Sequence, residues 1–437
     1  MDGLIYALGV IVFFVGLMAS IALHEVGHMW PAKKFGVKVT QYFVGFGRTV
    51  WSVRRGETEY GFKSIPLGGY VKLVGMLPPA KGDRQDEEHP ERVRSTNTGM
   101  FTQLISDARA AEYEHVQPGD EDRLFYRKPW WQKLIVMSGG PMVNLLIAVF
   151  LFGVVFVGIG APQATTTVSE VSQCVIPADQ ERQTCTDDDP VAPAYDAGIE
   201  PGDQIVSFNG QSVESWDDLT DMIRDNEAGA ATIGVVRDGE SLTLHTNTVV
   251  SLREDREQLD EFEHVGFLGV SPTQESERES PLFVATTMWE YTKLTGEAII
   301  DMPERMVGVA QAAFGDERED DSPMSVVGAS RVAGELSTVD ETTWGERAAQ
   351  LLALLAAVNL FVALFNFIPL LPLDGGHIAG ALWEAVRRGI ARLRRRPDPG
   401  YVDVAKMLPV AYAVASVLIV MGALLVYADI VNPVTLE

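Results

Sequence analysis

Four long apolar runs constrain the fold of this chain more than any other feature of its sequence. None of them contains Asp, Glu, Lys or Arg, and they cover about residues 3–23, 134–161, 348–373 and 407–428. An α-helix rises about 1.5 Å per residue, so about 20 apolar residues are enough to cross the hydrocarbon core of a bilayer. The sequence therefore predicts a membrane protein with an α-helical bundle of four transmembrane helices.

Basic residues predict how these helices are oriented. Three lysines follow the first run, namely Lys33, Lys34 and Lys38, and six arginines follow the third, namely Arg387, Arg388, Arg392, Arg394, Arg395 and Arg396. Loops rich in Lys and Arg stay in the cytoplasm, so both clusters are expected inside and both chain termini outside. The first run lacks a basic segment before it and a small-residue cleavage site. We therefore expect it to stay in the membrane rather than to be removed as a signal peptide.

The negative charge is confined to one region. The formal net charge is -25, and residues 161–345 hold 38 acidic and 10 basic side chains, whereas the rest of the chain holds 22 acidic and 25 basic ones. Adaptation of the cytoplasm to salt would have acidified the inner loops as well. This region is expected outside the membrane, where its acidity favours solubility and disfavours nucleic-acid binding.

Both cysteines, Cys174 and Cys185, lie in this acidic region. An even number of cysteines confined to an extracytoplasmic segment favours a disulfide that closes a small loop. Two free thiols are the alternative, and a zinc site built from this pair is disfavoured.

The first apolar run ends in the sequence His24-Glu25-Val26-Gly27-His28. Residues four apart lie on one face of a helix, so both imidazoles can bind one metal ion while Glu25 lies beside them. This H-E-x-x-H pattern is typical of zinc proteases. The alternative is a pair of surface histidines near the membrane interface, and a third ligand is needed to exclude it, because catalytic zinc takes three protein ligands and one water. We expect Pro31 to end this helix.

Asp374 is the candidate for the third ligand. It directly follows the third apolar run, where an ionisable side chain is costly unless it is paired. Pro369 and Pro372 are expected to unwind the helix and to turn the carboxylate inward. The first and third helices both run from outside to inside, so the two histidines and Asp374 should share one depth near the cytoplasmic side.

Residues 36–74 contain alternating Val, Tyr, Phe and Trp on both sides of a polar turn at residues 54–57, which predicts two strands. Four glycines interrupt them, and glycine in a strand marks a bend or the close approach of another backbone. These glycines are Gly45, Gly47, Gly68 and Gly69. A sheet with a free edge beside the metal could hold an extended peptide by strand addition, so we consider them candidate substrate-binding residues. A purely structural sheet is the alternative.

Two asparagines lie within the apolar runs and are further candidates for substrate binding. Asn144 follows Gly140 and Pro141 in the second run, and Asn366 lies near the end of the third. A polar side chain at depth in a membrane is a candidate for function. Hydrogen bonding between helices is the alternative.

The order of helix, strand and turn signals in the acidic region predicts a folded domain. A short helix and a glycine turn precede a strand, the turn Asn209-Gly210, a helix near residues 216–224 and a hairpin closed by Asp238-Gly239. This order resembles a PDZ domain, a module that binds extended chain ends along a strand edge. Whether its groove binds a ligand or only obstructs access stays open.

Apolar residues at helical spacing within residues 281–313 predict amphipathic helices that lie on the outer leaflet or against the bundle. Core packing against the PDZ-like domain is the alternative. In the polar residues 77–128, His89 and His115 are assigned no role, because an isolated loop histidine is usually solvated.

These patterns divide the chain into ten segments. They are transmembrane helix 1 (1–33), a β-loop (34–76), a polar cytoplasmic loop (77–129), transmembrane helix 2 (130–161), the PDZ-like extracytoplasmic α+β domain (162–255), an extracytoplasmic segment with amphipathic helices (256–345), transmembrane helix 3 (346–380), a basic cytoplasmic loop (381–405), transmembrane helix 4 (406–430) and an extracytoplasmic tail (431–437).

Together these residues resemble the site-2 protease family of intramembrane zinc metalloproteases. The first motif is His24 to His28, the second is Asn366, Pro369 and Leu373-Asp374-Gly375, and Gly140 to Asn144 matches the motif of the second helix. Residues 34–76 resemble the membrane-reentrant β-loop of the family, and the whole is most similar to four-span, single-PDZ actinobacterial members. One departure is that Leu371 stands where the family often has its second proline, and Pro372 follows one position later.

The resemblance implies one zinc ion per chain and cleavage of single-span membrane proteins in the plasma membrane. Such substrates are anti-sigma factors or signal-peptide remnants, shortened beforehand by a site-1-type protease. The resemblance also implies that the PDZ-like domain filters substrates by size.

The predicted mechanism places zinc on His24, His28 and Asp374 with a water in the fourth position, and Glu25 takes a proton from that water. A helix shields its carbonyls, so a substrate must unwind first, and Asn366 is expected to hold its backbone. A catalytically silent, membrane-anchored PDZ adaptor is the alternative. A metal transporter is disfavoured because the spans lack further carboxylates.

Overall fold

The computed structural model describes residues 2–79, 100–113, 116–180, 182, 184–186, 189–254, 262–315, 318, 322–339 and 343–434. The chain forms two compact units. The membrane unit comprises Met1–Gly158 and Ser280–Glu437, and the inserted unit comprises Ile159–Glu279.

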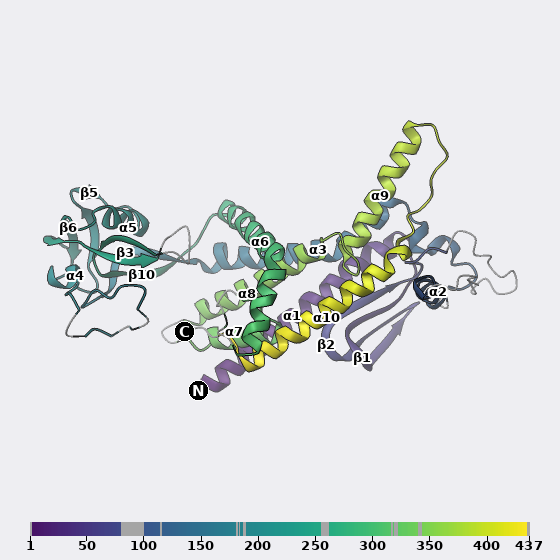
Figure 1. The fold of residues 1–437 in the computed structure, drawn as a ribbon, viewed down its shortest axis with the longest axis horizontal. Coiled ribbons are helices and arrows are strands. Elements are labelled where there is room, and N and C mark those ends of the chain that lie inside the picture. The colour runs from purple at the N-terminus through teal and green to yellow at the C-terminus, as the bar shows by residue number, and fades with distance from the viewer. Residues whose placement is uncertain are drawn as a thin grey trace. The chain divides into compact units, whose positions relative to one another are not determined.

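Four helices of the membrane unit are long and apolar enough to cross a bilayer, which confirms the four predicted spans (Figure 1). They are α1 (Asp2–Lys34), α3 (Trp130–Gly153, continued by π-helical turns at Val154–Ile159), α8 (Trp344–Asn366) and α10 (Leu408–Val431). Helices α1, α3 and α8 pack against one another.

Glycines let α1 and α3 cross at very short range. A Cβ atom on Gly139 would lie 1.9 Å from the carbonyl oxygen of Gly27, and one on Gly27 would lie 2.4 Å from the carbonyl oxygen of Gly139. No larger residue fits at either position without separating the helices. Small residues at such crossings are how membrane helices associate closely.

Helix α1 does not end at Pro31, contrary to the expectation from sequence. It continues to Lys34, and the Phe35 amide donates to the Pro31 carbonyl over 2.9 Å. A proline lacks an amide hydrogen and crowds the carbonyl four residues earlier, which here belongs to Gly27. Packing against neighbouring helices compensates for such a lost bond in membrane helices, and Gly27 packs closely on α3.

The predicted β-loop is a bent hairpin of β1 (Val39–Arg55) and β2 (Thr58–Leu73). The N-terminal part of β1 pairs on both sides, because Tyr42 lies opposite both Val71 and Tyr60. Beyond the bend, Trp51 lies opposite Phe62. The hairpin packs on α1, and the Tyr42 hydroxyl donates to the Ala22 carbonyl of that helix over 2.8 Å.

The segment 77–129 was expected to be a polar loop, but it also contains a helix and two short turns. Helix α2 (Met100–Tyr113) lies within it, and two 3₁₀ turns follow at Glu121–Arg123 and Phe125–Arg127. Polar contacts hold α2: Glu112 accepts from the Gly75 amide over 2.8 Å, and Arg109 pairs with Asp403 at 2.7 Å. The helix also carries apolar residues at helical spacing, namely Phe101, Leu104, Ile105 and Ala108, which the prediction of a loop overlooked. His89 and His115 lie outside the described residues.

The third predicted span, 346–380, is two helices rather than one. Helix α8 ends at Asn366, residues 367–373 are not helical, and α9 (Asp374–Leu393) begins at the predicted third ligand. The break at Pro369 and Pro372 was expected. The continuation of α9 through most of the predicted basic loop 381–405 was not, and it follows from the packing of Ile378, Ala381 and Glu384 along one face.

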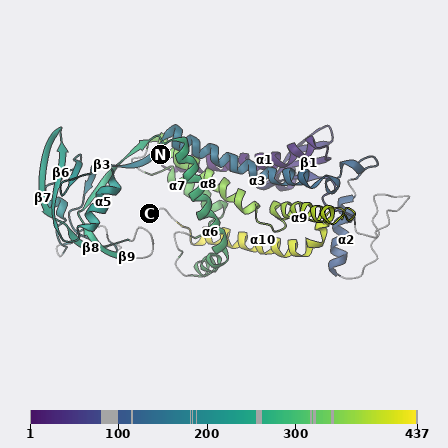
Figure 2. The same cartoon turned by 90° about the horizontal axis from the view of Figure 1, so that it is seen from above.

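The segment that was predicted to be extracytoplasmic, 256–345, contributes α6 (Pro281–Ala313) and α7 (Val326–Leu336) to the membrane unit. Helix α6 crosses the transmembrane helices rather than running along them (Figure 2). Its Met288 packs in one cluster with Phe152 of α3 and Leu360 of α8, and its Val309 packs with Ala428 of α10. The predicted amphipathic helix therefore lies against the bundle.

The inserted unit is larger than the predicted PDZ-like domain 162–255. Its main sheet has the order β10-β3-β4-β6-β7, with β5 paired to β4, and β8 and β9 form a separate hairpin. Its elements are β3 (Ala161–Val171), α4 (Pro193–Asp196), β4 (Gln204–Phe208), β5 (Gln211–Ser212), α5 (Trp216–Asp225), β6 (Ala230–Arg237), β7 (Glu240–Asn247), β8 (Val249–Glu254), β9 (Phe262–Phe267) and β10 (Val270–Glu277). Because β10 pairs with β3, the last strand of the sheet lies beyond the predicted boundary.

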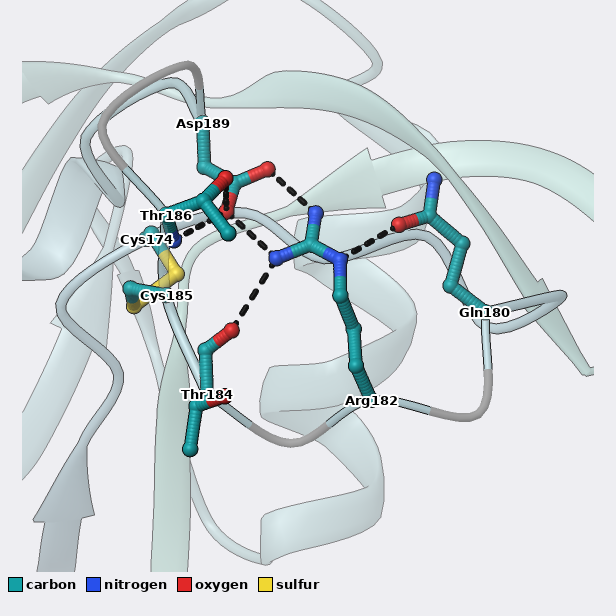
Figure 3. Close-up of a disulfide and its surroundings, with 7 residues drawn as sticks. All are labelled: Cys174, Gln180, Arg182, Thr184, Cys185, Thr186 and Asp189. Atoms are coloured by element: carbon teal, nitrogen blue, oxygen red, sulfur yellow. Dashed lines mark hydrogen bonds and ion pairs between the residues drawn. A yellow bond between two sulfur atoms is a disulfide. The ribbon is translucent and has the colours of Figure 1, made fainter.

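A disulfide joins Cys174 and Cys185 in the loop between β3 and α4 (Figure 3). The same loop is held by an ion pair between Arg182 and Asp189. The Arg182 guanidinium and the Thr186 amide keep the pKa of the Asp189 carboxyl below its usual range. The described residues of this loop are therefore cross-linked by one covalent bond and one ion pair.

Candidate metal centre

Three metal-binding side chains meet at one point of the membrane unit. The two imidazoles come from the C-terminal half of α1, and the Asp374 carboxylate comes from the first residue of α9. His24 Nε2 and His28 Nε2 are 3.2 Å apart, and Asp374 Oδ2 lies 3.4 Å from the former and 3.2 Å from the latter. Within the described part of the chain, no other group of three or more His, Cys, Asp or Glu side chains could hold a metal.

These distances fit a zinc ion. Donor atoms bound to one tetrahedral zinc at about 2.0–2.1 Å lie about 3.3 Å from one another. The three separations of 3.2 to 3.4 Å match this value. Two nitrogens and one carboxylate oxygen are also the donor set of several catalytic zinc sites.

A hydrogen bond selects the tautomer of His28. Its Nδ1 lies 2.8 Å from the Val136 carbonyl oxygen of α3. A carbonyl only accepts, so Nδ1 carries the hydrogen and Nε2 keeps its lone pair toward the other two side chains. The Nδ1 of His24 is buried without a hydrogen-bond partner among the residues described.

Gly140 of α3 provides the space in which the two imidazoles meet. A Cβ atom at this position would lie 2.3 Å from His28 Nε2 and 2.6 Å from His24 Nε2. Any side chain here would displace the two imidazoles. The motif Gly140 to Asn144 was recognised in the sequence, but this role of its first residue, and that of the Val136 carbonyl, depends on how α1 and α3 cross.

Glu25 is buried between α1 and the hairpin. A Cβ atom on Gly69 of β2 would lie 3.1 Å from the Glu25 Cγ, so only a residue without a side chain lets the strand approach this closely. Residues near Gly69 pair with β1 on one side only. The structure therefore places one strand of the predicted β-loop against the predicted base.

The other three predicted glycines shape the bend of the hairpin rather than the surroundings of Glu25. Gly45, Gly47 and Gly68 have φ values of 93°, 85° and 103°, which side chains rarely allow. At Gly45 the space for a Cβ is filled by the Ile65 carbonyl, 2.7 Å away. These glycines permit the register shifts between β1 and β2.

The two predicted asparagines differ. Asn144 lies one turn beyond Gly140 on the same face of α3, is buried, and its Oδ1 has no hydrogen-bond partner among the described residues. Asn366 is the last residue of α8, and its amide donates to the Val362 carbonyl of its own helix over 3.0 Å. An unsatisfied buried amide oxygen is rare, so Asn144 is the stronger candidate for binding a ligand.

Comparison with known proteins agrees with this geometry. The sequence profile of Peptidase family M50 matches residues 12–397, which include all three metal-binding side chains. The chain belongs to peptidase family M50. It is 32% identical to zinc metalloprotease Rip1 of Mycobacterium tuberculosis, over 99% of this chain and 100% of Rip1. It is 26% identical to metalloprotease MmpA of Caulobacter vibrioides (87% of this chain, 88% of MmpA) and 23% identical to the regulator of sigma-W protease RasP of Bacillus subtilis (86% and 90%).

As a member of this family, the protein is a zinc metalloprotease of the site-2 protease type. Zinc is its cofactor, and its four apolar helices make it a multi-pass membrane protein. The alternative of a catalytically silent adaptor is not supported by these findings.

Proposed function

We propose that His24, His28 and Asp374 hold the zinc and that Glu25 is the general base of an intramembrane protease. The observation that carries this proposal is the convergence of three metal-binding side chains from two helices beside a buried glutamate. When bound there, zinc polarises a carbonyl and lowers the pKa of a water.

The residues of the chain prepare this chemistry. His28 is held in one tautomer by the Val136 carbonyl, and Gly140 leaves room at both Nε2 atoms. Glu25 takes the proton of the attacking water and delivers it to the leaving nitrogen. Asn144, with its unpaired oxygen, binds an amide hydrogen of the substrate backbone.

We propose that the substrate is bound as an added strand beside β2. The residues around Gly69 pair with β1 on one side, which leaves the other side available to a peptide near Glu25. Strand addition requires an extended substrate, and an extended segment exposes the peptide bond that a helix would shield. Gly45, Gly47 and Gly68 serve this site indirectly, through the bend of the hairpin, and Asn366 stays a secondary candidate.

The substrates we propose are single-span membrane proteins shortened beforehand by a site-1-type protease, such as anti-sigma factors, or signal-peptide remnants. The name of the relative RasP, a regulator of sigma-W protease, supports a regulatory substrate. The inserted unit is proposed to be a PDZ-like domain outside the membrane that filters substrates by size. Its acidity and its sheet edge at β10 support this assignment.

Purified protein tests the proposal. Wild type and Glu25→Gln are incubated in detergent with a truncated single-span substrate, and zinc is measured in both. We expect one zinc per chain in both proteins and cleavage by the wild type only. Equal cleavage by Glu25→Gln contradicts the role of Glu25, and cleavage of a soluble loop rather than the apolar segment contradicts intramembrane proteolysis.

A further inference from the structure

A buried ion pair at the cytoplasmic end of the bundle joins the two helices that meet at the metal centre. Lys133 Nζ of α3 lies 2.7 Å from Glu384 Oε2 of α9, and the side chains are only 9% and 1% exposed. Glu384 also pairs with Arg388 at 3.0 Å and accepts from the Val402 amide over 3.4 Å. Neither residue of the pair has a part in the chemistry described above.

The geometry points to the Lys133–Glu384 pair as a positioning device that holds Asp374 against the two imidazoles. This inference rests on the proposed role of Asp374 as a zinc ligand. Lys133 and Glu384 are thus positioning residues, since they act through α9 and do not touch the metal centre.

One short stretch of α3 contacts both α1 and α9, the two helices that carry the proposed zinc ligands. Between Lys133 and Gly140 lies Val136, whose carbonyl accepts from His28 of α1. Val136 also packs in a cluster that includes Ile378, one turn along α9 from Asp374. The same eight residues of α3, 133–140, therefore contact α1 through a hydrogen bond and α9 through an apolar contact and an ion pair.

Apolar contact alone would leave α9 free to slide or rotate on α3, because dispersion and hydrophobic contact have little directionality. An ion pair with good geometry has one preferred arrangement, and buried polar pairs are best attested as devices that fix register. The start of α9 has no side-chain cap and is held by close packing on the preceding segment, since a Cβ atom on Gly375 would lie 2.0 Å from the Ile368 carbonyl oxygen. The ion pair adds a second point of attachment further along the helix. The pair acts ten residues beyond Asp374, at a distance that a rigid helix transmits.

The test compares variants in detergent by zinc affinity, measured by competition with a chelator, and by the visible spectrum of the cobalt-substituted protein. We expect Glu384→Gln to weaken zinc binding, but by no more than the about tenfold to hundredfold that loss of a direct hydrogen-bond partner of a metal ligand costs, because Glu384 acts only through α9. The cobalt bands should also change, because the carboxylate moves relative to the imidazoles.

The matched control is Asp120→Asn. It breaks the pair of Lys38 and Asp120, which are 2.5 Å apart, similarly buried and in the same unit, but not on α9. Its zinc affinity and cobalt spectrum should equal those of the wild type even where its thermal stability falls. If Asp120→Asn weakens zinc as much as Glu384→Gln, the effect is general destabilisation and the proposal is overturned.

Two further variants keep the outcomes distinct. The double variant Lys133→Met/Glu384→Met leaves neither member of the pair charged and serves if Glu384→Gln does not fold; zinc affinity equal to wild type in it overturns the proposal. Asp374→Asn is measured in parallel. Unchanged zinc binding in Asp374→Asn contradicts the ligand assignment itself, whereas weak binding there with normal binding in Glu384→Gln contradicts only the positioning role.

Discussion

Single residues decide whether the two imidazoles can share a metal. The H-E-x-x-H spacing puts both on one face of α1, but their Nε2 atoms meet only because α3 presents Gly140 to them. The hydrogen bond from His28 to Val136 then fixes which nitrogen is free. Helix α1 thus supplies the two imidazoles, whereas α3 supplies the space between them and fixes the tautomer of His28.

We predict that Gly140→Ala abolishes this space. The added methyl would lie 2.3 Å from His28 Nε2, so the imidazoles must move, and misplacement by about 1 Å costs about a hundredfold in rate. Zinc content and proteolysis of a truncated substrate measure the effect. The control is Gly153→Ala in the same helix, where no atom lies within 4 Å of the added carbon, and both readouts should stay normal. Full activity in Gly140→Ala would show that the site lies elsewhere.

At the scale of elements, the sequence predicted those features that depend on local apolar length, on prolines, or on the free-energy cost of a carboxylate next to the membrane. The four spans follow from uncharged length, and the position of Asp374 follows from the cost of a lone carboxylate after an apolar run. The break between α8 and α9 follows from Pro369 and Pro372. Each of these signals is local, so no knowledge of the fold was needed.

Other elements depend on contacts between distant parts of the chain and were missed. Helix α2 is held by an ion pair between Arg109 and Asp403, almost 300 positions away, and its apolar stripe of Phe101, Leu104, Ile105 and Ala108 is short. Helix α9 extends into a basic segment, where Glu384 forms a buried ion pair with Lys133 of α3. The continuation of α1 past Pro31 likewise depends on its crossing with α3.

Within the inserted unit, we predict that acid weakens the fold through Asp203. This carboxylate is fully buried and accepts two hydrogen bonds of 2.7 Å from Arg237, which lower its pKa below the ordinary value. A group whose pKa is lower in the folded state stabilises the fold above its unfolded pKa, about 3.9, and this stability is lost as the pH falls below that value.

Thermal unfolding between pH 7 and pH 3, followed by a probe in the inserted unit, checks this prediction. The wild type should lose stability in the acid part of the range. Asp203→Asn should melt lower at pH 7, because Arg237 loses its buried charged partner and keeps only the exposed Glu200, and should show less additional loss at pH 3. An identical pH dependence in both proteins would exclude Asp203 as the source.

We also predict that the disulfide of the inserted unit is present in the purified protein. Thiol labelling of the denatured, unreduced protein should detect no free cysteine, because the only two cysteines of the chain, Cys174 and Cys185, are bonded. After reduction two thiols should be labelled. Two labelled thiols before reduction would contradict the bond.

At the scale of the whole molecule, the acidity of the inserted unit and the basic clusters after the first and third spans predict that these segments lie on opposite sides of the membrane. We predict that Asp217→Cys, in the inserted unit, reacts with an impermeant maleimide in intact cells, whereas Arg396→Cys reacts only after permeabilisation. Both positions are exposed and both variants are made with Cys174 and Cys185 retained. The reverse pattern would place the metal centre near the outer face.

The central claim is that two imidazoles and one carboxylate from α1 and α9 hold a zinc ion inside a membrane protein. X-ray absorption at the zinc edge, measured on the purified wild type and on Asp374→Asn, tests it most directly. We expect two imidazole nitrogens and light oxygen donors at about 2.0–2.2 Å in the wild type, and a changed oxygen shell or lost zinc in the variant. Sulfur scattering, a single imidazole, or identical spectra for the two proteins would contradict it.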